Sequence, residues 1–193
     1  MHMRRTSLAL ILGLLGANVA EAQESFVLSD IIDEVRVGVH AHNAHYSLWP
    51  VYVGEWDLGN IHDVSFDVLF HSPQVDAFRW IGSPRPELGT TINFSGLEST
   101  FHAGLTWQVP VFETPFFLEG TFGAALHNGY LTSAPEGRKN LGCRINFYER
   151  FGVGVNITEN ATALLTYEHM SNAELCEANG GYSNFGLRVG MKF

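Results

Sequence analysis

The chain alternates apolar and polar residues over segments of about ten residues, and turn-rich stretches separate these segments. Within residues 34–40, for example, Val35, Val37 and Val39 share one side of an extended chain, whereas Arg36 lies on the other. Successive side chains of a β-strand point to opposite faces, so a period of two predicts amphipathic strands. No long stretch keeps the period of a helix.

This alternation recurs eight times along the chain. We predict strands within residues 34–40, 63–70, 88–94, 101–109, 116–127, 143–157, 162–168 and 184–193. Beyond the first residues, no segment offers the roughly 18 consecutive apolar residues that a membrane helix needs. If the chain crosses a membrane, it therefore crosses it as a closed barrel.

The composition of the polar faces indicates which side of each strand points inward. These faces are rich in glycine and in charges of both signs, as the narrow interior of a small barrel requires, and the last strand ends on the aromatic Phe193. We predict an all-β fold, an eight-stranded antiparallel transmembrane β-barrel of the bacterial outer-membrane type. A soluble lipocalin-like barrel, with every strand inverted, is the alternative. The charged residues expected to form ion pairs inside the barrel are Glu34, Arg36, Asp67, Glu119, Arg144, Arg150, Glu168 and Arg188.

The first residues resemble a secretory signal peptide. A basic start, an apolar run and a small-residue cleavage site ending at Ala22 predict a signal peptide over residues 1–22 and a single barrel domain over residues 23–193. Export permits disulfides, so Cys143 and Cys176 are a candidate pair. The net charge of −9 and a pI near 5.4 provide no basic surface for a nucleic-acid partner.

A histidine and a serine share one face at the end of the seventh strand. If both termini lie in the periplasm, residues 158–160 form a short periplasmic turn and residues 172–181 an extracellular loop. His169 and Ser171 then face lipid at the outer leaflet, roughly 6–7 Å apart along the strand. A base beside a hydroxyl is the minimum needed to activate a serine nucleophile, although polar residues also occur at strand ends for other reasons.

The same hairpin places Glu149 opposite His169 on an otherwise apolar face. There it is a candidate for the acid that orients a catalytic histidine, unless a bulge turns it inward. The register also sets Cys143 opposite Leu175, close enough to Cys176 for a disulfide.

Six segments together resemble a known family: EVRVGVHAHNA, PELGTTINFSG, GLTW, FFLEGTFGAALHNG, LGCRINFYE and EHMSNAELCEANGGYSNFGLRVGMKF. They are similar to the outer-membrane lipid A 3-O-deacylases (the PagL family) and their acyloxyacyl hydrolase-like relatives, most specifically in the last segment. The resemblance implies an eight-stranded barrel whose His-x-Ser, on the outer wall, hydrolyses an ester-linked acyl chain of lipid A in lipopolysaccharide.

By this motif match, His169 is the base and Ser171 the nucleophile, and Asn172 and Asn179 match asparagines that help to form an oxyanion hole. The chain departs from the family at Ser183, where the family has an acidic residue on the last strand. Either Glu149 replaces that acid, or the site works as a dyad, or the site is inactive.

The histidines of HAHNAH offer a second candidate site. His40 and His42 share a face and His45 lies nearby, but no cysteine or carboxylate completes a metal site in the sequence pattern, so pore-mouth histidines are the preferred interpretation. We expect an outer-membrane esterase with no metal and no organic cofactor, and we leave a homodimer open. The chief rival is a non-enzymatic small barrel, structural or adhesive, with a degenerate site.

Overall fold

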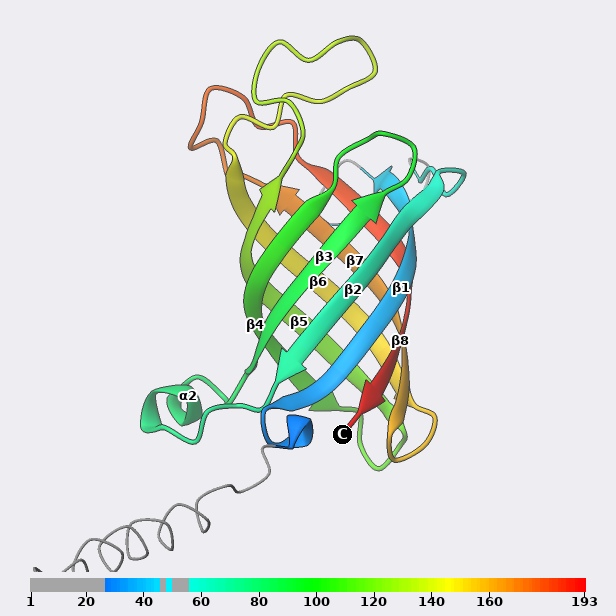
Figure 1. Cartoon of the computed structure of the whole chain (residues 1–193), viewed down its shortest axis with the longest axis vertical. Coiled ribbons are helices and arrows are strands. Elements are labelled where there is room, and N and C mark those ends of the chain that lie inside the picture. The colour runs from blue at the N-terminus through cyan, green and yellow to red at the C-terminus, as the bar shows by residue number, and fades with distance from the viewer. Residues whose placement is uncertain (1–26, 46–47, 50–55) are drawn as a thin grey trace, which may run out of the picture.

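The computed structural model describes residues 27–45, 48–49 and 56–193. Eight antiparallel strands pair in sequence order and close into a barrel, because the last strand pairs with the first (Figure 1). The strands are β1 (Ile32–His45), β2 (Ile61–Phe70), β3 (Arg85–Asn93), β4 (Thr100–Pro110), β5 (Phe116–His127), β6 (Ile145–Asn156), β7 (Ala161–Ser171) and β8 (Tyr182–Lys192). The predicted fold class is confirmed, whereas the predicted signal peptide lies outside the described residues.

Two short helices, η1 (Leu28–Asp30) and α2 (Asp76–Trp80), accompany the barrel. Both lie at the end that also holds Phe193, which we call the terminal end (bottom of Figure 1). The opposite, loop end carries the connections between β1 and β2, β3 and β4, β5 and β6, and β7 and β8. No helix in the described part of the chain has both the length and the apolar composition needed to cross a membrane.

The apolar side of the strands faces outward. Val37, Phe66, Leu118 and Leu187, on four different strands, are 48–50% exposed, whereas Arg36 is 1% exposed. The inverted, lipocalin-like alternative is therefore wrong. An apolar outer wall around a polar interior is the arrangement that a lipid surrounding selects.

Ion pairs fill the interior of the barrel. Arg36 binds Glu119 at 2.6 Å, and Arg150 binds Glu87 through both carboxylate oxygens at 2.6 Å. Arg188 binds Asp67 at 2.9 Å. These pairs cross from one strand to a distant one, so they tie the barrel wall together from inside. Other predicted members also pair there: Glu34 with Arg36, and Glu168 with Arg188.

Arg144 is the predicted member that the structure places elsewhere. Because β6 begins at Ile145, Arg144 precedes the barrel wall and is exposed. Its guanidinium instead donates to the backbone carbonyls of His127 and Gly129, at 2.7 and 2.9 Å. Gly142, with φ at +74°, turns the chain immediately before this point.

The β6–β7 hairpin has the tight turn that the sequence predicted at residues 158–160. The backbone N–H of Ile157 donates to the carbonyl of Ala161 at 2.8 Å, which closes the turn. A short turn fixes the register of both strands, so residues far up the hairpin are paired predictably. Glu149 accordingly pairs with His169.

Candidate active site

One polar residue on each of four neighbouring strands forms a row across the outer wall at the loop end. Glu149 on β6 pairs with His169 on β7, His169 pairs with Ser183 on β8, and Ser183 pairs with His45 on β1. We call these four residues the outer-wall row. The register of Glu149 and His169 is the predicted one. His45 was not expected in the row, and it arrives there because an irregularity in β1 follows Ala41.

His169 is held by its neighbour on β8. Its ring nitrogen Nδ1 lies 2.7 Å from Ser183 Oγ, and both residues are buried, at 6% and 0% exposed. With Nδ1 engaged, Nε2 is the ring nitrogen that remains for Ser171. Ser171 is half-buried and lies on the same face, two residues further on.

Glu149 lies opposite His169 without contacting it through a hydrogen bond in the described structure. Its Oε2 atom is buried and has no hydrogen-bond partner there. The imidazole Nδ1 of His169 is instead bonded on the other side, to Ser183. Strand pairing therefore sets Glu149 and His169 opposite each other, but no hydrogen bond joins their side chains in the described structure.

The outward face of β7 is covered where the sequence led us to expect contact with lipid. Trp56, from the connection between β1 and β2, packs against Tyr167 and Phe185 with ring centroids 5.7 and 5.1 Å apart. Leu48 from the same connection lines a pocket together with His169. His169 lies on the outward face as predicted, yet only 6% of it is exposed.

An open pocket of about 540 Å³ lies beside this histidine. His169, Ser171, Lys139, Asn179 and Gly181 are among the residues that line it. Gly181 makes room for it: a Cβ atom there would lie 2.8 Å from the Cβ of Ser171 and 2.5 Å from the carbonyl oxygen of Met170. Lys139 escaped the sequence analysis because no local pattern links its loop to β7.

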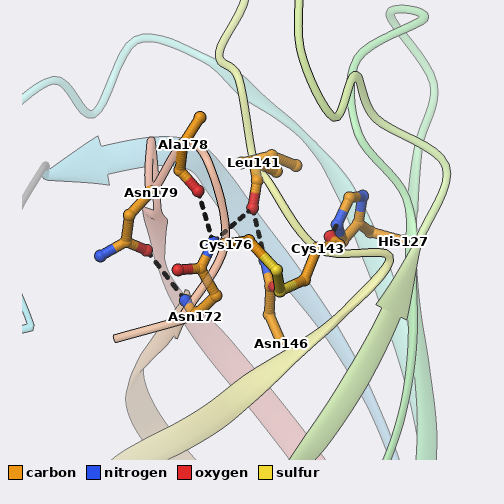
Figure 2. The surroundings of a disulfide bond; sticks show 8 residues. All are labelled: His127, Leu141, Cys143, Asn146, Asn172, Cys176, Ala178 and Asn179. Atoms are coloured by element: carbon orange, nitrogen blue, oxygen red, sulfur yellow. Dashed lines mark hydrogen bonds between the residues drawn. A yellow bond between two sulfur atoms is a disulfide. The ribbon is translucent and has the colours of Figure 1, made fainter. Parts of the chain in front are cut away.

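A disulfide joins the two loops that form this pocket (Figure 2). Cys143 lies near the end of the β5–β6 loop and Cys176 lies in the β7–β8 loop, with Cα atoms 5.7 Å apart. This is the pair that the register predicted. A cross-link between loops from different hairpins limits their relative movement. The disulfide thus holds together two of the loops at the rim of the pocket.

The two candidate oxyanion asparagines differ in their contacts. Asn172 is 2% exposed, and its side-chain amide donates to the carbonyls of Leu141 and Ala178, at 2.9 and 2.6 Å (Figure 2). Its backbone N–H donates to Asn179 Oδ1 at 2.9 Å. Only Asn179 lines the pocket, so the structure brings one of the two asparagines to Ser171's side and uses the other to bind the loops together.

The three histidines of HAHNAH do not converge on a common point. His40 points inward and its Nε2 lies 2.9 Å from Ser65 Oγ. His42 lies between Asp63 and Glu98, at 2.8 and 3.3 Å. His45 belongs to the outer-wall row, on the other side of the wall.

The charges at the pore mouth are paired. Burial disfavours the carboxylate of Glu98, but hydrogen bonds from His42 and Arg138 outweigh it and lower the pKa of Glu98 to about 2. One interior group of the described residues, Asp67, Glu87 and His102, could hold a metal ion by geometry. Its carboxylates already neutralise buried arginines, which leaves little charge for a cation.

Comparisons with known proteins agree with this architecture. The family model described as lipid A 3-O-deacylase (PagL) matches residues 55–192, and a search of curated proteins found no match. The crystal structure of the outer membrane enzyme PagL is similar with a TM-score of 0.52 and 18% identity, over 83% of this chain and 99% of that chain. The crystal structure of Neisserial surface protein A (NspA) is similar with a TM-score of 0.52 and 12% identity, over 84% of this chain and 97% of that one.

At these identities the two structures show the fold alone, which is that of small outer-membrane barrels. The family match carries more, because it covers most of the chain, including β2 to β8 and every pocket-lining residue except Leu48. The chain therefore belongs to the lipid A 3-O-deacylase (PagL) family of outer-membrane ester hydrolases.

Proposed function

We propose that this protein hydrolyses the ester-linked 3-O-acyl chain of lipid A, with Ser171 as the nucleophile and His169 as the general base. The observation that carries the proposal is the position of both residues on one pocket of the outer wall, with His169 Nδ1 bonded to Ser183. A histidine whose first nitrogen is held by a hydrogen bond presents the second in a defined direction. Family membership supports the substrate class.

The reaction proceeds in two steps. Neutral His169 donates its Nδ1 proton to the hydrogen bond with Ser183 and accepts the Ser171 hydroxyl proton at Nε2, while Ser171 Oγ bonds to the ester carbonyl carbon. The tetrahedral intermediate then expels the sugar hydroxyl, which takes the proton from His169, and leaves the acyl group on Ser171. Water, deprotonated by the same nitrogen, releases the fatty acid and restores the serine.

Asn179 is the better placed donor for the oxyanion. Its Oδ1 is held by the backbone N–H of Asn172, which leaves the NH₂ group of the same side chain free for the pocket. Asn172 supports the site indirectly, because both protons of its own amide are committed to loop carbonyls. The oxyanion of a tetrahedral intermediate gains most from such preset donors.

An apolar groove on the outer wall supports a lipid substrate. It has a volume of about 370 Å³ and is lined by Phe151, Leu165, Tyr167 and Phe185, among others. On β7 it begins two residues from His169, on the same face. An acyl chain in this groove would bring its ester to the pocket while the chain stays in an apolar environment.

Mass analysis of lipid A from cells that express the protein tests the proposal. The wild type should remove one acyl chain, and Ser171→Ala and His169→Ala should each lower turnover about a thousandfold or more while the barrel still folds. Because the two groups act as a unit, the double variant should be little worse than either single one. Unchanged lipid A with the wild type would favour the non-enzymatic barrel, and strong activity of Ser171→Ala would exclude the serine mechanism.

A further inference from the structure

Lys139 brings a positive charge to the same pocket from a distant part of the sequence. It lies in the β5–β6 loop and lines the pocket with His169 and Ser171. Its Nζ donates to Asn43 Oδ1 and to the carbonyl oxygen of Gly181, both at 2.8 Å. These two contacts fix the ammonium at the edge of the pocket, next to the glycine that makes room beside Ser171.

In the described structure Lys139 has no counter-ion, unlike Arg138 and His42 at the same end of the barrel. Arg144 also bonds only to backbone carbonyls, but it is exposed and does not line the pocket. Arg138 binds Glu98 at 2.9 Å, and His42 lies between Asp63 and Glu98. Within the part of the chain that the structure describes, no carboxylate oxygen lies within 4.0 Å of Lys139 Nζ, and both of its acceptors are neutral. Burial lowers the pKa of Lys139, and the nearby charge of Glu98 only partly opposes this. The half-buried ammonium therefore lacks an anion that would stabilise it.

A purely structural role does not require this charge. A neutral donor could join Asn43 to Gly181 without the desolvation cost of a half-buried ammonium. An ammonium has three protons, and two acceptors leave one N–H without a partner in the described structure. That free donor and the lining position in the pocket are what an anionic ligand group needs.

We infer that Lys139 is an anion-binding residue that receives a phosphate monoester on the sugar headgroup of the glycolipid whose ester Ser171 attacks. The inference rests on the proposed function for the identity of the substrate. The apolar groove would take the acyl chain on one side of Ser171, and the pocket with Lys139 would take the sugar and its phosphate on the other. Lys139 would then select phosphorylated glycolipids over neutral ones.

Kinetics with a matched pair of substrates tests this selection. The pair is a synthetic acylated glucosamine that carries a phosphate monoester and the same compound without the phosphate, both in mixed detergent micelles. The wild type should favour the phosphorylated compound at least about tenfold in kcat/KM, mainly through KM. Lys139→Gln should bring this ratio close to one, and Lys139→Arg should keep most of it.

Lys192→Gln is the matched control. Lys192 is the only other lysine in the sequence, and it bonds to Asn156 at the terminal end, far from the pocket. It should leave the ratio of the two substrates unchanged. A wild type that hydrolyses both compounds equally, or a Lys139→Gln variant that keeps the preference, would overturn the inference while leaving the esterase intact.

A binding measurement separates the two proposals. Ser171→Ala should bind the phosphorylated glycolipid more tightly than the neutral one, and adding Lys139→Gln should abolish the difference. This readout does not need turnover, so it tests Lys139 even if the wild type hydrolyses neither compound, which would count against the proposed function alone. Equal binding of both glycolipids to Ser171→Ala would refute the role of Lys139.

Discussion

The interior of the barrel and the outer wall at the loop end differ in how their charged groups are paired. Inside, Arg150 and Arg188 are matched with carboxylates at 2.6–2.9 Å. On the outside, Glu149 has a buried oxygen without a partner in the described structure, and Lys139 has only neutral acceptors there. Matched charges hold a wall together, whereas unmatched ones beside a pocket are available to a ligand.

Two serine–histidine contacts, one inside the barrel and one on the outer wall, allow the two regions to be compared for the same pair of residue types. Ser65 Oγ lies 2.9 Å from His40 Nε2 inside the barrel, and Ser183 Oγ lies 2.7 Å from His169 Nδ1 on the outer wall. Both are buried serine–histidine hydrogen bonds. Only the second histidine lines a pocket that also holds a serine hydroxyl. Access to a pocket, and not the hydrogen bond itself, is what distinguishes a candidate catalytic histidine here.

Breaking an interior pair should have the largest effect on stability. Arg150→Met leaves Glu87 without its bidentate partner in a buried site, and should lower the free energy of unfolding by about 3–5 kcal/mol. Urea unfolding of the refolded barrel in detergent micelles measures this. Arg79→Gln, which breaks the exposed pair with Asp76, is the matched control and should change stability by less than about 1 kcal/mol. Similar values for both variants would contradict the structural role of the interior network.

Removing the Ser183 contact of His169 should have a smaller effect, and this effect should be on catalysis and not on stability. Ser183→Ala deprives His169 Nδ1 of its acceptor and should lower kcat about tenfold, the equivalent of one hydrogen bond, with KM little changed. Ser183→Asp supplies a charged acceptor that stabilises the imidazolium, and should give a kcat above that of Ser183→Ala.

Ser65→Ala is the control for this experiment, since it removes the equivalent contact of His40 inside the barrel. Lipid A deacylation by this variant should match the wild type in kcat. If Ser183→Ala keeps the wild-type kcat, Ser183 does not position the histidine.

The smallest effect is expected at Glu149. His169 Nδ1 is already bonded to Ser183, and the proposed mechanism uses Nε2 for Ser171, so no ring nitrogen remains for the carboxylate. Glu149→Gln should therefore change kcat by less than about threefold, because Glu149 makes no hydrogen bond to either catalytic side chain in the described structure. A loss of tenfold or more in the same deacylation assay would instead support the hypothesis that Glu149 replaces the family's acidic residue.

The alternation of residues predicted the wall of the barrel well. Side chains of a strand alternate locally, and a tight turn fixes the register of its hairpin, so the eight strands, the pairing of Glu149 with His169 and the proximity of Cys143 and Cys176 all follow from short-range rules. Arg144 was misplaced because the exact start of a strand depends on the preceding turn, which periodicity does not report.

The tertiary structure alone decided what surrounds the predicted His-x-Ser. Trp56 covers the outer face of β7, His45 joins the outer-wall row, and Lys139 enters the pocket, each from a loop or strand end far away in the sequence. Loops have no repeating pattern, and their positions depend on contacts that form only after the barrel closes. The sequence by itself therefore determined the barrel and the placement of His169 and Ser171 on one face. Barrel closure brought distant loops to one rim, and these loops formed the pocket around the two residues and gave it the charge of Lys139.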